Sequence, residues 1–112
     1  MRRLETLQSV DDFVGRAVEA LEKKGKLDNT YIFYTSDHGY HFGLLGLLKD
    51  KRMPYEFDTR IPGFVRGPGI PKNSVGSQVM TMVDFAPTFL DIAGAPIPSY
   101  MDGRSVLGAL KS

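Results

Sequence analysis

The sequence predicts an α/β fold with a mixed sheet flanked by helices, and three observations predict it. Apolar residues recur at helical spacing over residues 10–24, and runs of β-branched and aromatic residues occupy residues 30–35 and 61–66. The first of these runs is apolar on both faces, which is typical of a strand covered by helices on both sides. Two or three strands are too few for a stable two-sided sheet, so the chain is either a small domain with a loose sheet or, as we expect, part of a larger domain.

The first element is expected to be an amphipathic helix. Ser9 followed by Asp12 is typical of a capping box at its start, and Gly25 suits the left-handed position after its end. The two lysines before that glycine suit the negative end of the helix dipole. Its apolar face consists of residues three and four positions apart: Val10, Phe13, Val14, Ala17, Val18 and Leu21.

The remaining elements are shorter. Residues 36–60 contain three glycines and then a charged cluster, which indicates a long functional loop with a short helix near residues 54–58. The elements expected after the second strand are a turn-rich loop at 67–73, a short strand at 77–82, a helix capped by Asp84 and ending near Ala93, and a last short helix at 105–110.

Composition excludes several classes of function. A formal net charge of +1 gives no basic field that would favour nucleic acid. No stretch approaches the roughly 18 apolar residues of a membrane span, and no signal peptide is expected within this stretch. The sequence has no cysteine, which excludes disulfides, thiolate metal sites and cysteine nucleophiles.

The most informative residues follow the first strand. Asp37 and His38 come directly after it, at the kind of strand end where ligands bind in α/β folds. A carboxylate there could bind a hard cation such as Ca²⁺ or Mg²⁺, and the imidazole could join it or bind an anionic substrate. The alternative is that Asp37 caps a turn and His38 is a surface residue. Gly39 is expected to let the loop turn sharply, and His41 is either a ligand or an incidental polar residue.

A second candidate region is the charged run from Lys49 to Arg52. Such runs usually mark a solvated face, but a lysine also suits a sulfate or phosphate group as a point charge. Composition does not decide whether Lys49 or Lys51 would turn inward. Residues 55–58 are expected to pack the loop against the sheet. Asp11 and Asp12 are expected to stabilise the first turn of their helix, rather than to bind metal, and Asp91 is expected to face solvent.

Several segments, in the correct order, resemble the sulfatase family from about residue 9 to the end. Within it, the likeness is to the glucosamine-6-sulfatases: the lysosomal N-acetylglucosamine-6-sulfatases and the extracellular heparan 6-O-endosulfatases. The resemblance implies that residues 1–112 are the C-terminal portion of a sulfatase catalytic domain, an incomplete part of an alkaline-phosphatase-like α/β sandwich. The matching segments are residues 29–43 with the family's metal ligands, 49–58, 60–69, 84–94 and 101–105.

The resemblance implies roles at matching positions only. Asp37 matches a carboxylate ligand of the calcium ion, and His38 falls where many sulfatases have a metal-ligating asparagine and the endosulfatase-like branch has histidine. Lys51 matches the lysine that contacts the sulfate group, and we place His41 beside it as a second sulfate-binding candidate. The expected cofactor is Ca²⁺, the expected partner is a sulfated glycosaminoglycan of the heparan type, and the expected location is lysosomal or extracellular.

The family's nucleophile is a hydrated formylglycine made from the first residue of a Cys/Ser-x-Pro-x-Arg motif upstream of these segments. No such motif occurs in this sequence. We therefore expect the chain to supply part of the metal and sulfate site of a hydrolase acting on 6-O-sulfated glucosamine, and we predict no turnover by these residues alone. The alternatives are a phosphoester hydrolase of the alkaline-phosphatase-like group, or a truncated inactive homologue that binds sulfated glycan.

Overall fold

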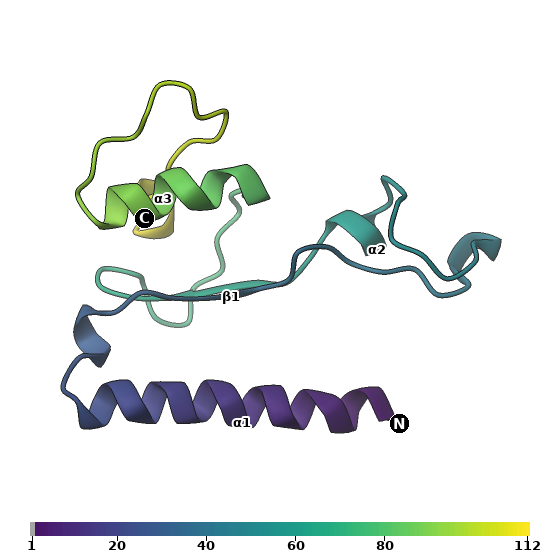
Figure 1. Cartoon of the computed structure of the whole chain (residues 1–112), viewed down its shortest axis with the longest axis horizontal. Coiled ribbons are helices and arrows are strands. Elements are labelled where there is room, and N and C mark those ends of the chain that lie inside the picture. Colours follow the sequence, from purple (N-terminus) through teal and green to yellow (C-terminus); the bar gives the residue numbers. More distant parts are fainter. Residues whose placement is uncertain (1) are drawn as a thin grey trace.

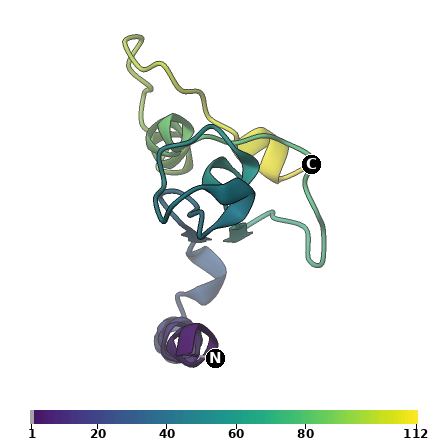
Figure 2. The same cartoon turned by 90° about the vertical axis from the view of Figure 1, so that its right-hand side faces the viewer.

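The structure, a computed structural model, describes residues 2–112, with side chains described from Leu4 onward. Within these residues two short strands lie between helices, as Figures 1 and 2 show from two directions. Helix α1 lies on one side of the strands, and α3 and α4 lie on the other side. The elements in order are α1 (Arg2–Lys23), η1 (Leu27–Asn29), β1 (Ile32–Thr35), η2 (Leu44–Gly46), α2 (Glu56–Thr59), β2 (Gly63–Arg66), η3 (Met82–Asp84), α3 (Phe85–Ile92) and α4 (Leu107–Leu110).

Helix α1 begins eight residues earlier than predicted. Leu4 and Leu7 continue its apolar stripe toward the N-terminus, and the residues around them are good helix formers. The predicted capping box at Ser9 is therefore wrong. For the same reason Asp11 and Asp12 lie in the middle of the helix rather than in its first turn, so the predicted dipole role is also wrong.

The end of α1 is as predicted. Gly25 adopts a positive φ of 61°, and its amide donates to the carbonyl of Glu22 at 2.8 Å. The amide of Lys26 donates to the carbonyl of Leu21 at 2.9 Å, which completes a Schellman motif. This motif directs the chain through η1 and into β1. No helix among residues 2–112 is both long and apolar enough to cross a membrane.

Strands β1 and β2 form an antiparallel pair, with Phe33 opposite Val65 and Thr35 opposite Gly63. The predicted strands at 30–35 and 61–66 are thus confirmed with shorter ends. The predicted strand at 77–82 is wrong: residues 77–80 have no regular structure and η3 begins at Met82. In the described part of the chain no third strand pairs with the sheet. Residues 77–82 therefore have no neighbouring strand with which to form backbone hydrogen bonds.

A small aromatic core joins the sheet to α3. The ring of Phe33 meets the rings of Phe85 and Phe89 edge-on, at centroid distances of 5.9 and 5.2 Å. Thr88 is fully buried beside them, and its hydroxyl donates to the carbonyl of Asp84 at 2.6 Å and accepts from the amide of Val106 at 3.1 Å. This core fixes β1 on one face only.

Asp84 anchors the start of the α3 segment, but not as the predicted cap of α3. Its carboxylate accepts hydrogen bonds from the Thr81 amide and hydroxyl, each at 2.8 Å, and from the Arg104 amide at 3.0 Å. Thr81 is the residue that caps, because it opens η3 in a capping box with Asp84. Asp91, expected to face solvent, is exposed, and its carboxylate accepts a hydrogen bond from the Ser105 hydroxyl.

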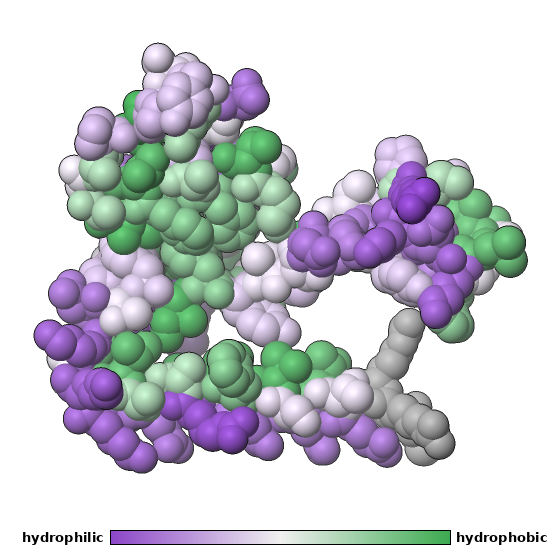
Figure 3. Space-filling view, in the orientation of Figure 1, coloured by the Kyte–Doolittle hydropathy of each residue, from purple (hydrophilic) through white to green (hydrophobic). Residues whose placement is uncertain are grey.

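Apolar side chains on α1 and β2, away from this aromatic core, remain uncovered. Phe13 on α1 and Phe64 on β2 are each about two-thirds exposed, at 66% and 65%, and Figure 3 shows apolar side chains along the edge of α1 that faces the strands. The accessible surface is 9184 Å², whereas a compact protein of this mass exposes about 6,100 Å². The radius of gyration is 16.7 Å, against about 13 Å for a compact chain of this length.

Candidate functional site

Asp37 and His38 form a polar pair shortly after β1. His38 Nδ1 lies 2.7 Å from the carbonyl oxygen of Gly39, and its Nε2 lies 3.0 Å from Oδ2 of Asp37. Because a carbonyl oxygen can only accept, Nδ1 carries a proton and donates to Gly39, while Nε2 faces the Asp37 carboxylate. The gap between Nε2 and the carboxylate oxygen holds either a proton or a cation.

The Asp37 carboxylate is open to solvent and ionised. Its side chain is 80% exposed. Desolvation is the largest single effect and acts to raise the pKa of Asp37. The hydrogen bond from the His38 amide, the neighbouring imidazole charge, the Asp37 amide and the Ser36 hydroxyl together outweigh it and lower that pKa. A carboxylate that is both exposed and ionised at neutral pH is an available cation ligand.

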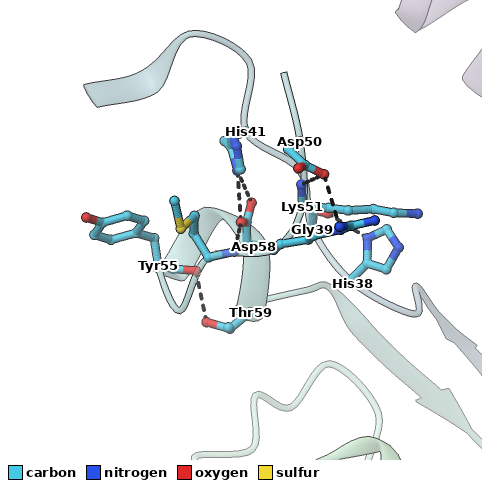
Figure 4. Close-up of polar contacts among 10 residues, drawn as sticks. His38, Gly39, His41, Asp50, Lys51, Tyr55, Asp58 and Thr59 are labelled. Carbon is cyan, nitrogen blue, oxygen red and sulfur yellow. Dashed lines mark hydrogen bonds and ion pairs between the residues drawn. The ribbon is translucent and has the colours of Figure 1, made fainter. Parts of the chain in front are cut away.

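His41 is buried, unlike Asp37 and His38. Its side chain is 3% exposed, and Nδ1 lies 3.0 and 2.9 Å from the two carboxylate oxygens of Asp58, which is 2% exposed. The Asp58 carboxylate also accepts the amide of Met53 at 3.0 Å. Figure 4 shows the ring pointing onto the carboxylate from the opposite segment.

Sequence reasoning missed the pairing of His41 with Asp58. The prediction that residues 55–58 pack the loop against the sheet is wrong: α2 contacts neither β1 nor β2. Phe57 instead meets the His41 ring edge-on, at a centroid distance of 5.8 Å. The two partners are 17 positions apart in the sequence, and no local spacing rule joins them. The available signal was a lone aspartate directly after an aromatic residue in a short helix.

Gly39 has a role other than the predicted sharp turn. Its φ is not positive, but a Cβ at this position would lie 2.0 Å from the carbonyl oxygen of Phe57. The Gly39 amide donates to the Asp58 carbonyl at 2.7 Å, and the Tyr40 amide donates to the Phe57 carbonyl at 2.9 Å. Glycine is therefore required because two backbones approach closely, and the contact ties the strand end to α2.

Lys51 lies in the loop that faces this segment. The backbones of His41 and Asp50 form an antiparallel bridge, with amide-to-carbonyl distances of 3.0 and 3.4 Å. The Lys51 amide donates to the Asp50 carboxylate at 2.9 Å. The Lys51 side chain is exposed, like that of Lys49, and within residues 4–112 it makes no hydrogen bond or ion pair. Its ammonium group is available to an anion.

The described residues offer only part of a candidate metal site. Asp37 and His38 are adjacent, whereas no group of three or more histidine, aspartate or glutamate side chains in residues 4–112 is placed to hold a metal ion. Ca²⁺ takes about six to eight oxygen ligands. The pair fits as one side of such a site, and its donor types allow a divalent cation with mixed oxygen and nitrogen ligands.

Comparison with known proteins identifies relatives along almost the whole chain. A family model described as Sulfatase matches residues 2–95. The chain is 56% identical over 111 residues to the extracellular sulfatase SULF-1 homolog of Drosophila melanogaster, covering 99% of this chain and 10% of that protein. It is 50% identical over 111 residues to the N-acetylglucosamine-6-sulfatase of Homo sapiens, covering 98% of this chain and 20% of that protein.

Solved structures confirm the predicted fold class. One is a protein in complex with its substrate D-glucosamine-2-N,6-O-disulfate, with a TM-score of 0.87 at 45% identity, over 95% of this chain and 22% of that one. Another is a phosphonate monoester hydrolase from Silicibacter pomeroyi, with a TM-score of 0.80 at 34% identity, over 91% and 20%. The chain thus spans between a tenth and a fifth of the curated relatives named above. It belongs to the sulfatase family.

Proposed function

We propose that this chain forms part of the site of a sulfuric ester hydrolase that removes 6-O-sulfate from glucosamine or N-acetylglucosamine in heparan-type glycosaminoglycans. The observation that carries the proposal is the pair of exposed Asp37 and half-buried His38 after β1, in a loop tied by backbone hydrogen bonds to the loop of Lys51. The similarity to glucosamine-6-sulfatases and to a complex with a 6-O-sulfated glucosamine supports the substrate class.

Asp37 and His38 would hold the divalent cation, which we propose is Ca²⁺. Asp37 would contribute a carboxylate oxygen, and His38 would contribute Nε2 while Nδ1 stays on the Gly39 carbonyl. When bound, a divalent cation would stabilise negative charge on the sulfate oxygens. The other ligands would come from outside the described residues.

Lys51 would bind the sulfate group. Its ammonium would neutralise charge on the sulfuryl oxygens and on the leaving oxygen. A contact of His41 with sulfate stays a prediction. Such a contact would use Nε2, because Nδ1 faces Asp58.

The proposal assigns this chain charge stabilisation and ligand positioning, and not nucleophilic attack. The formylglycine nucleophile would be supplied by a Cys/Ser-x-Pro-x-Arg motif, which these 112 residues do not contain. We therefore propose that the residues act as the C-terminal portion of a catalytic domain, in a lysosomal or extracellular enzyme like the named relatives. The 112 residues alone are expected to show no hydrolysis.

A second candidate function is phosphonate or phosphate ester hydrolysis. The observation that favours it is the close structural match to a phosphonate monoester hydrolase, at a TM-score of 0.80. A tetrahedral phosphoryl group would bind the same cation and lysine. Relative rates on matched sulfate and phosphonate esters decide between the two.

The test is a chimera in which this chain replaces the matching segment of the human N-acetylglucosamine-6-sulfatase, with which it shares 50% identity. We expect release of sulfate from N-acetylglucosamine 6-sulfate, lost with a chelator or with Asp37→Asn. Lys51→Ala should lower kcat/KM by about 100-fold, while Lys49→Ala, the matched control, should leave it near the parent value. A folded chimera without activity, or equal effects of the two lysine variants, would contradict the proposal.

A further inference from the structure

We infer that His41 and Asp58 are positioning residues that fix Lys51 relative to the Asp37–His38 pair. The inference rests on the proposed role of Lys51 in sulfate binding. The two side chains form a buried pair that joins the loop after β1 to α2. The loop of Asp37 and His38 and the loop of Lys51 are both hydrogen-bonded to this pair or to the backbone beside it.

The atoms that join the two side chains all have hydrogen-bond partners. Nδ1 of His41 donates between the two carboxylate oxygens of Asp58, and the Met53 amide takes a further position on Oδ2. Among the described residues no buried side-chain nitrogen or oxygen lacks a partner. A buried carboxylate with satisfied partners holds its geometry, because moving either donor would leave its charge less well paired at a site that is only 2% exposed.

Lys51 lies between two points held by this pair. On one side, Asp50 is bridged to the backbone of His41. On the other side, the amide of Met53 is bound by Asp58. Only Lys51 and Arg52 lie between these points, so the backbone of Lys51 has little room to move although its side chain is exposed. A flexible lysine with an anchored backbone loses less conformational entropy when it binds an anion.

The metal-ligand loop is tied to the same helical turn. Gly39 and Tyr40 donate their amides to the carbonyls of Asp58 and Phe57, directly after Asp37 and His38. Helix α2 therefore serves as a common base for both loops, as Figure 4 shows for Gly39, Asp58 and the His41 ring. Loss of the His41–Asp58 hydrogen bonds would loosen the lysine and the metal ligands relative to each other.

The two ring nitrogens of His41 separate this inference from direct sulfate binding. The side-chain amide of asparagine reaches about where Nδ1 lies, and the amide of glutamine reaches about where Nε2 lies. A positioning role through Asp58 needs a donor at Nδ1. A direct ligand role needs Nε2. His41→Asn and His41→Gln are thus matched variants with opposite expected results.

The experiment measures kcat/KM for N-acetylglucosamine 6-sulfate in the chimera. We expect His41→Ala and His41→Gln to lower kcat/KM by about 10-fold or more, the size of effect seen for residues that orient ligand side chains without contacting the substrate. His41→Asn should recover most of that loss. Asp58→Ala should match His41→Ala, and the double variant should be no worse than either single variant. Better recovery by glutamine, or equal activity of all the variants, would overturn the inference.

A separate readout covers the case of a chimera that is folded but inactive, which would refute the proposed function alone. In that folded chimera, amide hydrogen exchange of Met53 reports the Asp58 contact directly, whether or not the chimera is active. His41→Asn should exchange at least about fivefold more slowly at this amide than His41→Gln and His41→Ala. Equal exchange rates at Met53 in the parent and all three variants would overturn the positioning role.

Discussion

Gly39→Ala tests whether close backbone contact at the strand end is needed for function. The added Cβ would lie 2.0 Å from the Phe57 carbonyl oxygen, 2.8 Å from its carbonyl carbon and 3.0 Å from the Asp58 Cα. All three are backbone atoms, which a rotamer change does not move away. The two segments must separate by more than about 1 Å to reach ordinary contact.

The separation has a cost that can be worked out from the contacts. It breaks the hydrogen bonds from the Gly39 and Tyr40 amides to α2, which are 2.7 and 2.9 Å long. Each contributes about 0.5–1.5 kcal/mol, and overpacking by itself costs about 1–3 kcal/mol. We therefore expect the free energy of unfolding of the chimera to fall by about 2–6 kcal/mol. Displacement of ligands by about 1 Å should lower kcat/KM by about 100-fold.

Urea unfolding followed by circular dichroism gives the stability change, and steady-state sulfate release gives the activity change. Gly76→Ala is the matched control, because Gly76 has an ordinary φ and a Cβ there meets no atom within 4 Å. An alanine at position 39 with the stability and kcat/KM of the control would refute the reasoning, since the two backbones could then not be in contact.

Three further predictions concern other parts of the fold. Gly15→Ala should raise the unfolding free energy of the chimera by about 0.5–1 kcal/mol, because Gly15 lies inside α1 and a Cβ there meets no atom; a lower urea midpoint would contradict this. Hydrogen bonds from the Arg104 amide and from the Thr81 amide and hydroxyl lower the pKa of Asp84 in the folded protein. The ionised carboxylate therefore stabilises the fold above the ordinary aspartate pKa of about 3.9, and this stabilisation is lost as pH falls through the lowered pKa of the folded state. Unfolding free energy should thus decline with acid below about pH 4, with a shallower decline in Asp84→Asn measured by the same urea titration. The 112-residue chain alone should bind the dye ANS through its exposed apolar faces, and a cooperative thermal transition without dye binding would indicate instead a domain that is stable by itself.

Local patterns predicted the parts of the fold that depend on local interactions. Strand β1 and the Gly25 end of α1 were found because β-branched content and a left-handed glycine are local properties. The start of α1 was missed because the capping-box pattern at Ser9 competed with a longer apolar stripe, and the stripe determined the structure. The expected strand at 77–82 needed a partner strand, which no local pattern supplies.

The candidate site also combines features that depend on local sequence with features that depend on tertiary structure. Asp37 and His38 could be proposed from the sequence because they follow the end of a strand, and the structure places them one and two residues after Ser36, which comes directly after β1. The pairing of His41 with Asp58 depends on how a loop folds back across 17 residues, and composition does not contain that information. Composition also leaves open the choice between Lys49 and Lys51. Of these two lysines, only Lys51 lies between the Asp50 bridge and the Met53 contact, and that placement is tertiary.

The uncovered surface bears on whether the chain acts as a binding module or as part of a catalytic domain. It exposes 9184 Å², about 3,000 Å² more than a compact protein of its mass. A standard protein–protein interface buries only about 800 Å² on each partner. The excess is several times larger and includes Phe13 on α1 and Phe64 on β2, which belong to different layers. One docked partner would cover one face, whereas further strands and helices of a larger α/β domain would cover both. The area therefore favours the proposed catalytic-domain role over a glycan-binding module that is stable by itself.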